Sequence, residues 1–144
     1  MAQTTGAPVE LMKPAPLWPV SVKGVLFVGR EVVLLKNERD EWELPGGRLE
    51  AGEEPGPCLL REISEELGID VELGDLLDCW RYPVLPGKEV LIVTFGVQPL
   101  SSADLRLSHE HKALGCFPIA EIDRLPMPEG YRRSIRNWAR RSGL

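Results

Sequence analysis

Three glutamates stand close together near the middle of the chain, in the segment REISEELGI that begins at Arg61. If this segment is helical, successive residues turn by about 100°, so Glu62, Glu65 and Glu66 fall on one face. Like charges at these spacings repel, and the dipole at a helix C-terminus disfavours anions. A solvated polar face is the ordinary explanation for such a cluster. The repulsion among these glutamates instead favours a bound cation that would offset it, and Mg²⁺ and Mn²⁺ prefer oxygen ligands.

The element that carries these glutamates is predicted to be a helix from about Pro55 to Leu67. Pro55 suits a first helical position, and Pro57 still falls among the first-turn residues whose N–H groups need no partner. Gly68 suits the position just beyond the helix end. The apolar stripe that we expect to be buried consists of Leu59, Leu60, Ile63 and Leu67.

Around this helix the sequence predicts an α/β domain in which helices pack on a mixed sheet. Two β-branched runs separated by Gly29 and Arg30 indicate a hairpin, and WELPGG indicates a short strand that ends in a tight turn. The predicted strands cover 21–28, 31–37, 71–82, 89–97 and 113–118, and the later helices cover 119–125 and 130–141.

Length and composition fit one globular domain. The chain has 144 residues, of which 43% are hydrophobic and 27% charged, enough for a core without disulfides or a structural metal. Residues 1–19 contain four of the 13 prolines, so we expect an irregular arm there and the domain over 20–144. The three cysteines match neither a disulfide framework nor a zinc spacing, and we expect them to be reduced.

The overall charge argues against some partners. A formal net charge of −5 gives no general attraction to nucleic-acid polymers or anionic membranes. The first residues form no apolar run of signal-peptide length, and nowhere do about eighteen apolar residues follow one another. We therefore expect no membrane association and a cytoplasmic location, and we leave a homodimer open.

The glutamate segment resembles the Nudix box, in which a glycine, five residues, Glu and seven residues precede Arg-Glu-aliphatic-x-Glu-Glu-x-Gly-aliphatic. Chance would produce such a match on the order of one time in a million. The fixed positions are filled by Gly47, Glu53, Arg61, Glu62, Ile63, Glu65, Glu66, Gly68 and Ile69. The resemblance spans roughly residues 20–140. It implies an α/β/α sandwich and hydrolysis of a nucleoside diphosphate linked to another moiety.

The resemblance also implies roles for the matching residues. Glu62, Glu65 and Glu66 would ligate one to three Mg²⁺ ions, or Mn²⁺ as a substitute, and the Gly47 carbonyl is a possible further ligand. Arg61 would orient the glutamates by hydrogen bonding, for which its fixed fork is suited. The residues assigned to catalysis are Glu53, Arg61, Glu65 and Glu110.

Two of these assignments leave alternatives open. Glu53 is either a supporting residue, a base or a ligand that acts through water. Glu110 is the candidate base from outside the box, in a polar loop between His109 and His111, although a charged loop residue is more often simply solvated.

Substrate choice is less defined than the chemistry. Trp18, Trp80 and Tyr82 could stack on a nucleobase, although aromatic side chains more often pack in a core or at its rim. Arginines from 132 to 141 lie on a predicted helix, where a solvated basic face is the ordinary explanation. The favoured function is hydrolysis of nucleotide sugars, ADP-ribose-like compounds or modified nucleoside triphosphates. The alternatives are a catalytically silent nucleotide-binding module and an RNA 5′-pyrophosphohydrolase.

Overall fold

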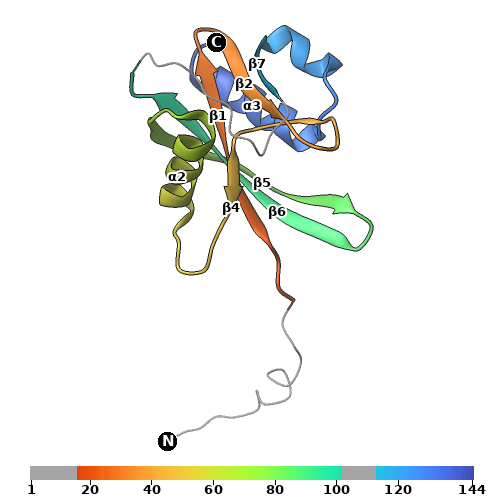
Figure 1. Cartoon of the computed structure of the whole chain (residues 1–144). Helices are drawn as coiled ribbons and strands as arrows, with labels where there is room; N and C mark the ends of the chain where they lie inside the picture. The colour runs from red at the N-terminus through yellow and green to blue at the C-terminus, as the bar shows by residue number, and fades with distance from the viewer. Residues whose placement is uncertain (1–15, 102–112) are drawn as a thin grey trace, which may run out of the picture.

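The computed structural model describes residues 16–101 and 113–144 and shows a sheet between two helices (Figure 1). Strand β1 (Val20–Val28) is central, because it pairs with β2, β4 and β6. Only the β1–β6 pairing is parallel, so the sheet is mixed, as predicted. The other strands are β2 (Glu31–Lys36), β3 (Trp42–Glu43), β4 (Gly46–Arg48), β5 (Val71–Leu85), β6 (Lys88–Pro99) and β7 (Ala113–Pro118).

The helices lie on opposite faces of this sheet. Helix α2 (Pro55–Leu67) packs on β1, β4 and β5, while α3 (Glu129–Arg141) packs on β1, β5 and β6. A 3₁₀ helix, η1 (Ile119–Arg124), precedes α3. Figure 1 shows the two helices separated by the strands, which confirms the α/β/α sandwich.

Alternation along the strands explains the two apolar cores. Side chains on successive strand residues point to opposite faces, so Val22 and Leu26 of β1 pack toward α2, while Val25 and Phe27 pack toward α3. The α2 core is completed by helix residues that include Cys58, Leu59, Ile63 and Leu67. The α3 core is completed by Tyr131, Ile135, Trp138 and Ala139. Both helices are therefore held against the sheet by buried apolar surface.

Three predicted strands differ from the observed ones. The segment WELPGG is not one strand, because β3 pairs with β2 and β4 pairs with β1. The strands expected at 71–82 and 89–97 also continue to Leu85 and from Lys88, so the PVLPGK segment is largely strand. Pro83 is tolerated there because β5 is the outermost strand of its sheet, where the N–H that proline lacks is not needed.

The buried stripe of α2 is also rotated from its expected position. Leu60 is only half-buried, whereas Glu66 is 5% exposed and lies at the margin of the buried side. One proposed metal ligand thus sits much deeper than a surface helix face would place it. No helix in the described residues has the length and apolar character needed to cross a membrane.

Candidate metal centre and active site

Local sequence signals place the glutamates of α2 as predicted. Proline occupies the first helical turn, and Gly68 ends the helix at φ 70°, a conformation that glycine adopts at little cost. The Gly68 N–H donates to the Ser64 carbonyl at 2.9 Å. These ends fix the helical register, and with it the directions of the carboxylates.

The diglycine that begins β4 brings backbone directly against two of these carboxylates. The Gly46 N–H donates to Glu66 Oε1 at 2.8 Å. A Cβ on Gly47 would lie 2.3 Å from Glu62 Oε2, and one on Gly46 would lie 2.0 Å from the Val22 carbonyl oxygen. Only glycine permits both approaches. The glycines are therefore required by the packing of β4 between β1 and the glutamates.

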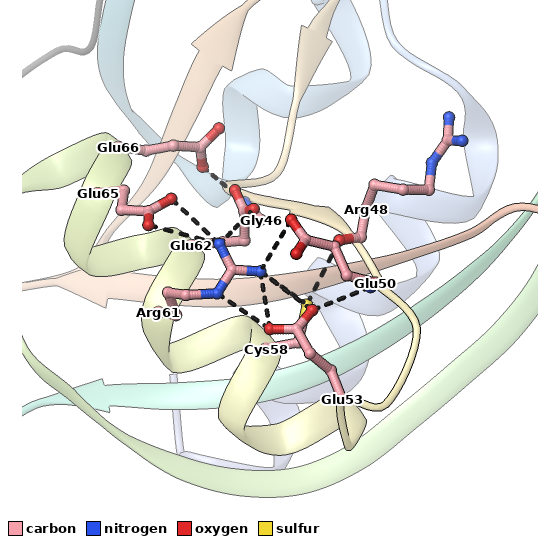
Figure 2. Close-up of polar contacts among 9 residues, drawn as sticks. All are labelled: Gly46, Arg48, Glu50, Glu53, Cys58, Arg61, Glu62, Glu65 and Glu66. Atoms are coloured by element: carbon pink, nitrogen blue, oxygen red, sulfur yellow. Dashed lines mark hydrogen bonds and ion pairs between the residues drawn. The ribbon is translucent and has the colours of Figure 1, made fainter.

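Arg61 is the centre of an ion-pair cluster with four carboxylates (Figure 2). Its Nε and Nη2 each donate to Glu53 at 3.0 Å, forming a bidentate pair. Its Nη1 donates to Glu62 Oε1 at 3.1 Å and to Glu65 Oε1 at 3.2 Å. Nη2 also lies 3.8 Å from Glu50. One guanidinium thus links the loop before α2 with two of the proposed metal ligands.

These contacts shift the pKa values of both partners in the bidentate pair. The hydrogen bond to Glu53 is the main cause that raises the pKa of Arg61 above its usual value. The pKa of Glu53 is lowered, first by the Glu50 N–H that donates to it at 2.9 Å and then by Arg61. Both groups are therefore fixed in their charged forms, which suits orientation better than proton transfer at neutral pH.

The three proposed ligands differ in exposure along the cluster. The Glu65 side chain is 59% exposed and that of Glu62 is 16% exposed, whereas Glu66 is buried against Gly46. In Figure 2 the Glu62 and Glu65 carboxylates contact Arg61, and the Glu66 carboxylate contacts Gly46. Side-chain exposure therefore decreases from Glu65 at the surface, through Glu62, to Glu66 in the protein interior.

The donor set fits Mg²⁺ or Mn²⁺ in chemistry. Carboxylate and carbonyl oxygens are the ligands that these cations prefer, and the missing Cβ of Gly47 allows the backbone to approach Glu62. Among the described residues, however, no group of three or more His, Cys, Asp or Glu side chains is arranged as a metal cage. Glu62 and Glu65 are turned toward Arg61, and Glu66 toward Gly46. Coordination of one ion would require these contacts to rearrange.

The structure brings together most of the residues expected at the site. Gly47, Glu53, Arg61, Glu62, Glu65 and Glu66 all contribute to this cluster. Glu110, proposed as the base, lies outside the described residues, as do its neighbouring histidines.

Several residues beside the cluster were not singled out from sequence. The Cys58 thiol donates to the Arg48 carbonyl at 3.6 Å, and burial, followed by Glu53, raises its pKa to about 11. Lys23 is buried beside Gly46 in the β1–β4 register and lies 3.8 Å from Glu43. A lysine within an apolar strand was the one available signal, since lysine is rarely buried without a partner.

Two of the three aromatic candidates for base stacking are used in packing. Trp80 meets Tyr131 edge-on at a centroid distance of 5.1 Å, and it lies against Gly130 of α3. The Tyr82 hydroxyl donates to Glu41 at 2.9 Å. Trp18 differs, since it is 43% exposed.

The basic face of α3 is neutralised by neighbouring acids. Arg132 pairs with Glu129 at 3.0 Å, and Arg141 pairs with Asp75 at 3.1 Å. Arg133 lies 3.7 Å from Asp78, and Arg136 pairs with Asp123. These four arginines therefore have a structural role.

Known proteins resemble this chain along most of its length. The pattern of the NUDIX domain matches residues 17–138. The chain is 34% identical over 117 residues to a MutT-like protein of Streptomyces ambofaciens, which covers 80% of this chain and 73% of that protein. It is 36% identical over 132 residues to an octanoyltransferase of Myxococcus xanthus, of which it spans only 37%.

A solved structure shows the same arrangement of elements. The MutT protein from Methanosarcina mazei Go1 matches with a TM-score of 0.74 at 24% identity, over 88% of this chain and 96% of that one. This structural match shows the fold, whereas the match to the NUDIX domain shows the family. Because the domain pattern covers most of its residues, this chain belongs to the Nudix hydrolase family.

Proposed function

We propose that the chain is a divalent-metal-dependent pyrophosphohydrolase that cleaves a phosphoanhydride in a nucleoside diphosphate linked to another moiety. The observation that carries the proposal is the Arg61 cluster, in which four carboxylates surround one guanidinium beside a diglycine backbone. A protein freed from chemistry would have no need of such repulsion. Similar proteins, which include a MutT-like protein and an 8-oxo-dGTP diphosphatase of Proteus vulgaris, agree with this class of reaction.

The residues that would hold the cation are Glu62, Glu65 and Glu66, with the Gly47 carbonyl as a possible fourth ligand. Mg²⁺ is the expected ion and Mn²⁺ a substitute. The chemistry that such a cation supplies when bound is charge neutralisation on the two phosphates and activation of water for attack on phosphorus.

The protein's own groups would provide orientation. Arg61 holds Glu62 and Glu65 in place through Nη1, and Glu53 fixes the guanidinium through two hydrogen bonds. Since the pKa of Glu53 is lowered, we assign it this positioning role in preference to that of a base. Glu110 stays the candidate for the base, as predicted from sequence.

The wider assignments follow from the same proposal. The domain would cover residues 20–144 after an arm over 1–19, and the protein would act in the cytoplasm on a small nucleotide. A homodimer stays open. The silent nucleotide-binding module is the runner-up, and removal of pyrophosphate from RNA 5′ ends is the third candidate.

The test is a hydrolysis assay with a panel of nucleotide sugars, ADP-ribose and modified nucleoside triphosphates in Mg²⁺ or Mn²⁺. Glu62→Gln and Glu66→Gln should lower turnover by at least about 100-fold, more than loss of an outer-shell partner costs. Glu54→Gln is the matched control, because Glu54 is exposed and its side chain makes no capping hydrogen bond to α2. Absence of metal-dependent products across the panel would favour the silent module.

A further inference from the structure

A hollow of about 730 Å³ lies between residues 16–19 and the tip of the β5–β6 hairpin, away from the glutamates. We call it the hairpin pocket. Figure 1 shows the start of β1 and the hairpin tip on the same side of the sheet. The residues that line it include Leu17, Trp18, Arg39, Arg48, Leu85 and Lys88.

The pocket concentrates positive charge in an acidic protein. Arg39, Arg48 and Lys88 line it together with one acid, Glu89, while the whole chain carries a net charge of −5. Arg39 is engaged with Glu41 at 3.6 Å. Arg48 and Lys88 are exposed and form no ion pair with other described residues. These two side chains are therefore available to an anionic ligand.

The rest of the pocket wall is apolar. Trp18 is 43% exposed, Leu17 93% and Leu85 52%, and these side chains form a surface suited to a flat ring. Apart from the three cations and Glu89, the described lining residues are aliphatic, aromatic, proline or glycine. The described pocket wall offers a nucleobase a surface for stacking. It offers no hydroxyl or amide side chain that could form hydrogen bonds with the edge of the base. Stacking alone tolerates every base, because each has a π-face.

A second hollow of about 580 Å³ is lined by some of the same residues and by the loop before α2. It shares Leu17, Trp18 and Arg48 with the hairpin pocket, and it reaches Glu50 and Glu53. Both of these glutamates contact Arg61. Arg48 directly follows Gly47 in β4, and Figure 2 shows its side chain directed away from Glu62. Arg48 thus lines the pocket and is next in sequence to Gly47, whose backbone approaches Glu62.

We propose that the hairpin pocket binds the nucleoside monophosphate half of the substrate, with the base against Trp18 and its phosphate near Arg48 and Lys88. This assignment rests on the proposed function for its link to catalysis. The phosphate chain would then pass the edge of β4 toward Glu62. The protein would demand negative charge on the nucleoside side and would discriminate little among bases.

The test measures binding separately from turnover. Calorimetry of the metal-free Glu66→Gln full chain with ADP, GDP and UDP should give affinities within about threefold of one another. Adenosine and ribose 5-phosphate, which each lack one half of the ligand, should bind at least about tenfold more weakly than ADP, the factor that one good contact supplies.

Variants then locate the ligand. Arg48→Gln with Lys88→Gln should weaken ADP binding by at least about tenfold. Trp18→Ala should do the same, whereas Trp18→Phe should retain binding within about threefold, since phenylalanine can still stack. Arg30→Gln with Arg140→Gln is the control for lost surface charge, because both arginines are exposed outside the pocket.

Equal ADP affinity in the pocket and control variants would overturn the proposal, as would no ADP binding by the metal-free chain. Strong preference for one base would overturn the stacking assignment. Binding that follows the predicted pattern without hydrolysis by the wild-type chain would uphold the pocket and refute the proposed function. Hydrolysis by the wild-type chain, together with unchanged ADP binding in the pocket variants, would refute the pocket assignment and uphold the proposed function.

Discussion

The two helices that flank the sheet carry opposite charges and resolve them differently. On α3, four arginines face four acids: Arg132 and Glu129, Arg133 and Asp78, Arg136 and Asp123, Arg141 and Asp75. On α2, Arg61 alone faces Glu50, Glu53, Glu62 and Glu65. Four of the five arginines of α3 are thus matched one to one by acids, while the α2 cluster leaves an excess of carboxylate. We propose a cation site for this excess and a structural role for the matched pairs.

The largest effect should follow from closing the approach between β4 and α2. In Gly47→Ala the new Cβ would lie 2.3 Å from Glu62, so the carboxylate must move. A displacement of about 1 Å in a catalytic arrangement can cost about 100-fold in rate, and we expect a loss of this size in kcat/KM. Steady-state kinetics with the best substrate of the panel measures it. Gly47→Ala should also lower the melting temperature, and adding Glu62→Ala, which removes the carboxylate without placing a glycine inside α2, should restore it without activity. Failure to restore it would contradict the clash.

Arg61→Lys should separate the two helices by function. Lysine keeps the charge but cannot form the bidentate pair with Glu53 while reaching Glu62 and Glu65, so activity should fall about 10- to 100-fold. Arg133→Lys on α3, where the pair with Asp78 spans 3.7 Å, should change activity little. Kinetics of both variants at saturating Mg²⁺ provides the comparison. Equal losses would mean that Arg61 is no more than a surface ion pair.

These predictions use contacts that the sequence indicated only in part. The helical spacing placed Glu62, Glu65 and Glu66 on one face, and the resemblance implied that Arg61 orients the glutamates by hydrogen bonding. Burial of Glu66 was not predictable, because it depends on Gly46, twenty residues earlier, being drawn in by the β1–β4 pairing. Local periodicity carries no information about such long-range contacts.

The arginines of α3 and the hairpin show the same limit. A basic helix face was predicted as solvated, and Arg133, Arg136 and Arg141 are indeed partly exposed. The acids that pair with these three come from η1 and β5, which only the folded chain brings near. The strands predicted over 71–82 and 89–97 left 83–88 as a connection, while the edge position of β5 allows the strand to continue through Pro83. Trp18 could be separated from Trp80 only once packing against Tyr131 was known.

Ser134→Ala should affect stability and leave chemistry unchanged. The Ser134 hydroxyl is buried, and it donates to Asp78 Oδ2 at 2.7 Å while sharing a 2.7 Å contact with Thr94. Loss of the hydroxyl leaves buried polar groups unsatisfied, which costs about 1–3 kcal/mol of unfolding free energy. Urea denaturation measures this change. A variant that lost activity at full stability would assign α3 a catalytic role and break the contrast.

The smallest effect concerns pH. Because the pKa of Glu53 lies below its ordinary value of 4.5, its stabilising contribution is complete above that pH and is lost as pH falls through the lowered pKa. Melting temperatures of Glu53→Gln and wild type should therefore differ at neutral pH and converge in acid. Glu54→Gln provides the baseline for an exposed neighbour. A constant difference at every pH would show that Glu53 acts without its charge.

The most direct test of the proposed metal site on α2 is cation binding to the substrate-free chain. Titration calorimetry with Mg²⁺ and Mn²⁺ should show saturable binding to the wild type, weakened at least about tenfold in Glu62→Gln and in Glu66→Gln, as expected when a ligand is lost. Arg133→Gln on α3 should bind as the wild type does. Binding that is absent from the wild type, or unchanged in both glutamate variants, would contradict the assignment of the α2 face as a metal site.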